Sequence, residues 1–147
     1  MGMNNTLNLV RGYPGQGKTT FANRFFANIP KFENDMYFYR NGVYCYDASK
    51  MRNAIEWCLR NAERCLKEGM DVCVSNTFTK ISFVNSYRNL AEKYGADFSI
   101  YRMMGEFGNI HNVPPDVFKN MKSNFEAYDG EILVYPDENA NQGYDFR

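Results

Sequence analysis

Short apolar runs alternate along this chain with longer segments whose apolar residues recur at helical intervals. The runs Leu7–Val10, Asp71–Ser75 and Asp97–Met103 predict strands, because a near-continuous apolar centre suits a strand that is covered on both faces. Weaker patterns predict a second short strand over Lys31–Asp35 and a last one over Glu131–Tyr135.

Four segments predict helices, because their apolar residues recur at intervals of three and four. They run over about Thr19–Ala27, over Ala48–Lys67 with Asp47 as a predicted N-cap, over Ser82–Tyr94, and from Pro114-Pro115 to about Phe125. Strands that alternate with helices in this rhythm predict an α/β fold with three layers. Its mostly parallel sheet would have four to five strands.

Length and composition narrow the class of protein. With 147 residues, 44% of them hydrophobic, the chain fits one globular domain over 1–135, followed by a polar and acidic tail over 136–147. No apolar stretch approaches the ~18 residues of a membrane span, and no secretory signal is visible at the N-terminus. We therefore expect a cytoplasmic protein that does not contact a membrane.

Charge and metal-ligating residues exclude two further classes. The formal net charge is zero, which argues against a protein that coats long nucleic acid. The four cysteines show no CxxC pairing and there is a single histidine, so the sequence offers no zinc site. We expect the cysteines to serve as small packing residues.

One segment carries a motif with a specific chemistry. Gly12 to Thr19 fits G-x-x-x-x-G-K-[ST] at every fixed position, after a predicted strand and before a predicted helix. The glycines let backbone N–H groups form a concave anion site, and the helix N-terminus adds its dipole. The predicted nucleotide-binding residues are Gly12, Pro14, Gly15, Gln16, Gly17, Lys18, Thr19 and Thr20. Lys18 would contact the β- and γ-phosphates of ATP, and the Thr19 hydroxyl would hold Mg²⁺.

Other classes of nucleotide-binding protein require motifs that the sequence lacks. We find no N-K-x-D-like segment of a switch GTPase, and the run Val72–Ser75 does not end in the carboxylate of a motor ATPase. A small kinase remains, in which an acid activates an acceptor hydroxyl. Asp35 is the candidate, because ligands of parallel sheets bind at the carboxyl ends of strands.

Four segments in order extend this interpretation: RGYPGQGKTT (11–20), ENDMYF (33–38), SNTFTK (75–80) and GNIHNVPPDVFKNMKSNFE (108–126). Over about residues 7–126 the chain resembles polynucleotide-kinase-like P-loop proteins, relatives of the phage and bacterial 5′-hydroxyl polynucleotide kinases. The resemblance implies a P-loop NTPase fold with a helical lid, in a bacterial or phage-infected cell. It also implies phosphoryl transfer from ATP to a DNA or RNA end, a nucleotide or a modified base.

The resemblance also assigns roles to residues. By position, Lys18 and Asp35 look like the catalytic residues, with Asp35 as general base. The substrate-binding residues would be Tyr37, Arg40, Asn76 and Thr77. The lid would extend from Gly105 to His111 and into the following helix, with contributions from Arg102, His111 and Asn112.

The chain departs from the family at three places. Phe38 stands where polynucleotide kinases usually carry an arginine, and Asn76 stands where the phage kinases carry an aspartate. The lid region has no arginine, although Arg102 is placed to substitute. These departures keep a second hypothesis open: an ATP-binding regulatory or interaction protein with little or no phosphotransfer.

Two local features have alternative interpretations. The aromatic cluster Tyr37, Phe38, Tyr39, Tyr44 and Tyr46 could stack nucleic-acid bases, or it could pack a loop against the long helix. His111 could contact adenine, or it could be a polar residue of a loop.

Overall fold

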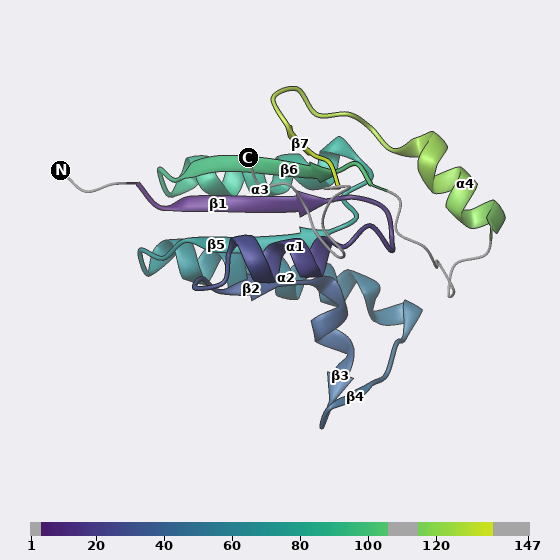
Figure 1. Ribbon diagram of the computed structural model, residues 1–147. Helices are drawn as coiled ribbons and strands as arrows, with labels where there is room; N and C mark the ends of the chain where they lie inside the picture. The colour runs from purple at the N-terminus through teal and green to yellow at the C-terminus, as the bar shows by residue number, and fades with distance from the viewer. Residues whose placement is uncertain (1–3, 106–114, 137–147) are drawn as a thin grey trace.

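Five parallel strands form the central sheet, in the order β2-β5-β1-β6-β7 (Figure 1). The computed structural model describes residues 4–105 and 115–136. The strands are β1 (Thr6–Arg11), β2 (Lys31–Phe32), β5 (Val72–Asn76), β6 (Asp97–Met103) and β7 (Ile132–Val134). The predicted tail lies outside the described residues from 137 onward.

Three helices cover the two faces of this sheet: α1 (Lys18–Phe25), α2 (Met51–Lys67) and α3 (Ile81–Lys93). The structure also contains α4 (Pro115–Asn124). Residues of α2 and α3 pack against one face and residues of α1 against the other, which makes three layers. The α/β fold with a parallel sheet is thus confirmed. α4 lies beyond the carboxyl ends of the strands (Figure 1).

The buried strand β1 shows why the sheet forms where it does. Leu7 and Leu9 belong to the apolar cluster with α2 and α3, while Val10 belongs to the cluster with α1. All three side chains are fully buried, and each contributes about 1.5–3 kcal/mol of hydrophobic stabilisation. Cys58, Cys65 and Cys73 are buried packing residues, as predicted, whereas Cys45 is exposed.

The second strand is shorter than predicted, and this changes the setting of Asp35. β2 pairs with β5 only at Lys31 and Phe32. The chain then enters a 3-10 helix over Asn34–Phe38. The backbone N–H of Asn34 donates to Oδ1 of Asn76 at 2.8 Å, which takes it away from the strand ladder. Asp35 therefore lies in a helical turn after the strand, not at a strand end.

Two more features follow that turn. A hairpin of β3 (Tyr39–Arg40) and β4 (Val43–Tyr44) is joined by Asn41 and Gly42, both at positive φ, as the two-residue hairpin turn requires. The predicted long helix begins with a separate 3-10 turn over Ala48–Lys50, and Asp47 caps it by accepting the Ser49 N–H at 3.0 Å.

The described part of the chain contains neither a membrane-spanning helix nor a cluster of metal-ligating side chains. None of its helices is long and apolar enough to cross a membrane. Its His, Cys, Asp and Glu side chains form no group of three or more that could hold a metal ion.

Candidate active site

The predicted phosphate-binding loop connects β1 to α1 with a backbone that requires glycine. Gly15 and Gly17 have φ values of 81° and 80°, in the left-handed region that other residues enter at a cost. Gly12 has a different constraint. A Cβ there would lie 2.7 Å from Oε1 of Gln16 and 3.0 Å from Cβ of Met103. The glycines of the motif thus serve two purposes: backbone conformation and close packing.

Gln16 holds the loop from inside. Its Oε1 accepts the Tyr13 N–H at 2.7 Å, and its Nε2 donates to the carbonyl of Gly105 after β6. The side chain is buried among these partners. Gln16 therefore contributes to the shape of the loop, and the backbone and Lys18 remain the groups available to a phosphate.

A cavity of about 430 Å³ lies in front of the loop, at the carboxyl ends of β1, β2 and β5; we call it the donor cavity. It is lined by Pro14, Gly15, Gly17, Lys18, Thr19, Thr20, Glu33, Asn34, Asp35, Met51, Ser75, Asn76 and Thr77. Segments far apart in sequence thus bring the loop, the predicted base and the predicted acceptor-site residues Asn76 and Thr77 to one place.

Lys18 is the cationic group of the donor cavity. Its Nζ donates to the carbonyl of Tyr13 at 2.9 Å. Burial lowers the pKa of this amine from 10.5 to about 8, and the nearby charges of Glu33 and Asp35 oppose the shift. A buried ammonium with a weakened hold on its proton is stabilised by an added anion. The site is therefore electrostatically suited to a polyphosphate.

Two carboxylates face this lysine. Asp35 accepts a hydrogen bond from the Tyr44 hydroxyl of the hairpin at 3.3 Å. Glu33 accepts one from Oγ1 of Thr19 at 2.5 Å. Glu33 was not among the site residues predicted from the sequence. The spacing Glu33-x-Asp35, directly after the second predicted strand, is the pattern that could have indicated it.

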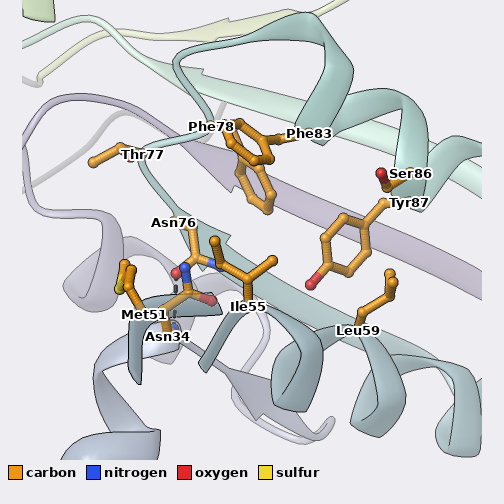
Figure 2. Close-up of a pocket in the computed structure, with 10 residues that line it drawn as sticks. All are labelled: Asn34, Met51, Ile55, Leu59, Asn76, Thr77, Phe78, Phe83, Ser86 and Tyr87. Atoms are coloured by element: carbon orange, nitrogen blue, oxygen red, sulfur yellow. Dashed lines mark hydrogen bonds between the residues drawn. The ribbon is translucent and has the colours of Figure 1, made fainter. Parts of the chain in front are cut away.

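A second cavity of about 290 Å³ adjoins the first; we call it the apolar cavity (Figure 2). Four residues line both: Asn34, Met51, Asn76 and Thr77. The apolar cavity continues between α2 and α3, lined by Ile55, Leu59, Phe78, Phe83, Ser86 and Tyr87. No residue in its lining carries a charge. Of the residues that line the apolar cavity, only Asn76 and Thr77 were predicted from the sequence as binding residues.

Arg11 braces the wall behind this cavity. Its side chain is fully buried and donates through Nε and Nη2 to the carbonyl of Phe78, at 3.2 and 2.5 Å. It also forms an ion pair with Glu131 at 2.9 Å. Phe78 has a φ of 46°, a conformation that a bulky residue adopts only when its surroundings hold it. The guanidinium supplies that hold and joins β1 to the loop after β5.

Other predicted site residues lie away from both cavities. Arg40 donates to the carbonyls of Tyr37 and Tyr39 in the hairpin region, and Tyr37 packs against Trp57. Arg102 forms an ion pair with Glu131 at 3.2 Å. The predicted lid residues His111 and Asn112 lie outside the described residues.

The aromatic cluster divides into a packed part and an exposed part. Phe38 is buried, and its ring contacts Tyr37, Tyr44 and Tyr46. The side chains of Tyr39, Tyr44 and Tyr46 are exposed. Packing therefore accounts for Phe38 and Tyr37, whereas the hairpin tyrosines present an aromatic surface close to Asp35.

Among the relatives that sequence comparison finds, one is described as uncharacterized. No protein-family model matches the chain. An uncharacterized protein of Pasteurella multocida (strain Pm70), PM0531, is 26% identical over 155 residues, which cover 89% of this chain and 83% of the relative.

Solved structures share the fold. A gluconokinase from Sinorhizobium meliloti 1021 superposes with a TM-score of 0.64 at 13% identity, over 92% of this chain and 84% of that one. Chaetomium thermophilum Kti12 in complex with ADP-AlF3 gives 0.64 at 14% identity, over 90% and 91%. A chain of the Pnkp1/Rnl/Hen1 complex gives 0.62 at 16% identity over 97% of this chain, which spans about half of that protein's length, 51%. The chain thus has the fold of P-loop kinases.

Proposed function

We propose that the protein is an ATP-dependent small kinase that transfers the γ-phosphate of ATP to an alcohol. The observation that carries the proposal is that Lys18 and Asp35 line the same cavity, in front of a loop shaped to bind phosphate. The fold shared with a gluconokinase and with a nucleotide-bound Kti12 supports it.

The residues of the donor cavity fit a magnesium nucleotide. Oxygen atoms of Thr19, Glu33 and Asp35 lie around it, and oxygen ligands are what Mg²⁺ requires. Thr19 would hold the ion once its hydroxyl exchanges Glu33 for the metal. When bound, Mg²⁺ would neutralise charge on the phosphates. The loop N–H groups and Lys18 would bind the β- and γ-phosphates.

Asp35 would act as the general base. Its carboxylate takes the proton from the acceptor hydroxyl while the acceptor oxygen forms a bond to the γ-phosphorus. The bond from that phosphorus to the bridging oxygen breaks, and ADP leaves with the electron pair. Lys18 stabilises the charge that develops on the transferred group and the leaving oxygen.

The resemblance to polynucleotide kinases suggests the acceptor. We propose a nucleic-acid end, a nucleotide or a modified base. Its binding residues would be Tyr37, Arg40, Asn76 and Thr77. A likeness to a chain of the Pnkp1/Rnl/Hen1 RNA repair complex is consistent with this acceptor class. Arg102, His111 and Asn112 remain the proposed lid residues, and Arg102 would have to leave Glu131 to reach a phosphate.

Replacement of the base tests the proposal. Asp35→Asn keeps the shape of the side chain, and we expect it to lower the transfer rate by about 10² to 10⁴-fold. ATP binding, measured by calorimetry, should change little. Asp129→Asn, at an exposed position in the turn before β7, is the matched control and should retain full activity. Equal transfer rates for the two variants would refute the role of Asp35.

The alternative is a nucleotide-binding regulator without transfer. One observation favours it: no arginine lines the donor cavity among residues 4–105 and 115–136. In that case ATP would bind, and neither the wild type nor Asp35→Asn would phosphorylate any acceptor.

A further inference from the structure

The apolar cavity identifies the chemistry of the acceptor. We propose that it binds an uncharged, ring-bearing alcohol of nucleoside size, whose hydroxyl receives the phosphoryl group. This inference rests on the proposed kinase function, and it departs from the phosphate-bearing acceptors that the resemblance implies. Four observations support it: position, hydrogen-bonding groups, wall chemistry and the absence of charge in the lining.

The position of the cavity is that of an acceptor site. Its residues Asn34, Met51, Asn76 and Thr77 also line the donor cavity. Asp35 follows Asn34 directly, in the same 3-10 turn. A ligand that fills the apolar cavity and extends one hydroxyl past Asn34 would therefore reach both the base and the γ-phosphate.

The cavity contains one buried polar atom that lacks a partner among the described residues. Oδ1 of Asn34 is buried and accepts no hydrogen bond within the described part of the chain. The Tyr87 side chain is also buried, and its hydroxyl end points toward α2 across the cavity (Figure 2). Leaving a buried acceptor unsatisfied costs about 1–3 kcal/mol. A ligand hydroxyl or amide that donates to Asn34 would remove that cost.

The walls suit a ring. Met51, Ile55 and Leu59 of α2 lie on one side, and Phe78, Phe83 and Tyr87 lie on the other (Figure 2). Phe83 is 42% exposed, although its side chain is large and apolar. A volume of about 290 Å³ is at the lower end of the range for small-molecule sites. Together these features fit one compact ring system between the two helices.

The absence of charge in the lining argues against a phosphorylated acceptor. Nucleic-acid sites neutralise backbone phosphates with lysine and arginine, whereas this lining offers only amides, hydroxyls and apolar groups. An unpaired phosphate would lose its hydration without gaining a partner. A nucleoside combines a ring, several hydroxyl donors and no charge, which matches the cavity on each count.

The experiment compares two acceptors that differ only at the 3′ position, where one carries a charged phosphate. Each of the eight common nucleosides and deoxynucleosides is offered beside its 3′-monophosphate, which carries the same 5′-hydroxyl. Initial rates are measured with ATP and Mg²⁺. We expect at least one nucleoside to have a kcat/KM at least tenfold above that of its 3′-monophosphate. A preference for 3′-monophosphates or oligonucleotides would overturn the inference and leave the kinase proposal standing.

Binding without turnover separates the two proposals. Nucleoside affinity for the Asp35→Asn variant, loaded with ADP, is measured by calorimetry. Nucleoside binding, with no transfer by the wild type to nucleosides, 3′-monophosphates or oligonucleotides, would retain the apolar cavity as a ligand site and refute the kinase. Failure of all eight to bind would overturn the inference, whatever the kinase activity.

Two variants locate the binding. Phe83→Ala removes a partly exposed ring from the cavity wall, and Leu133→Ala removes a similarly exposed side chain from β7. We expect Phe83→Ala to raise the KM for the nucleoside about tenfold with little change in the KM for ATP. Leu133→Ala should change neither. Equal effects of the two variants would contradict the assignment of the cavity.

Discussion

The donor cavity and the apolar cavity share a wall but differ in how the chain builds them. The donor cavity takes its phosphate-binding part from one contiguous segment, Gly12 to Thr20, and contains Lys18, Glu33 and Asp35. The apolar cavity takes its residues from the 3-10 turn after β2, from α2, from β5 and the loop after it, and from α3, and contains no charge. One site is specified by local backbone conformation, the other by the packing of two helices.

Because the two cavities are built differently, different interactions stabilise them. In the donor cavity, positive φ angles and the side chain of Gln16 fix the loop from within. The wall of the apolar cavity depends on Arg11, which reaches it from β1. Perturbations should therefore affect the two sites unequally.

Loss of Arg11 should have the largest effect. Arg11→Met removes a fully buried guanidinium and leaves Glu131 and the carbonyl of Phe78 short of donors. Breaking a buried pair in this way costs about 3–5 kcal/mol of unfolding free energy. Denaturant titration measures this loss. Because Arg11 holds the wall at Phe78, nucleoside affinity should fall more than ATP affinity.

The control is an exposed ion-pairing arginine. Arg60 on α2 pairs with Glu56 and Glu63 at the surface, so Arg60→Met should cost under about 1 kcal/mol. Equal destabilisation by the two variants, or a larger loss of ATP affinity than of nucleoside affinity in Arg11→Met, would contradict the role given to Arg11.

A smaller effect, confined to the donor cavity, concerns pH. Lys18 has a pKa of about 8 in the free protein, and bound phosphates should raise it. ATP affinity should therefore fall as the pH rises above about 8, by up to about tenfold per unit, with proton uptake on binding. The affinity for adenosine, which stays uncharged over the same range, should stay flat, since the apolar cavity holds no titrating charge.

Calorimetry in buffers of different ionisation enthalpy measures the proton uptake, and Lys18→Met should abolish it. The same group acts on stability. The folded protein holds this proton less tightly than the unfolded chain, so the contribution of Lys18 to the unfolding free energy is unfavourable below pH 8 and fades as the pH rises toward 10.5. Binding of ATP without proton uptake at pH 9 would refute the assignment of the pH dependence of ATP affinity to Lys18.

The same contrast explains what could be predicted from the sequence. β1, β5 and β6 were predicted because their apolar runs are continuous, and the phosphate-binding loop because its motif is contiguous. The 3-10 turn at Asp35 was missed because a side chain 42 residues away, Asn76, determines it. The apolar cavity was missed because it also depends on packing between segments far apart in sequence. Helical spacing predicts that Ile55 and Tyr87 are buried, but not that a space remains between them.

The most direct test of two adjoining sites that meet at Asp35 is a single affinity measurement. The probe is a nucleoside joined through its 5′-oxygen to adenosine by four or five phosphates. If the two cavities adjoin as described, it occupies both, and its affinity should exceed that of ATP by about 10²-fold or more. Phe83→Ala should remove much of this gain. A probe that binds no more tightly than ATP, and that nucleosides do not displace, would contradict the account.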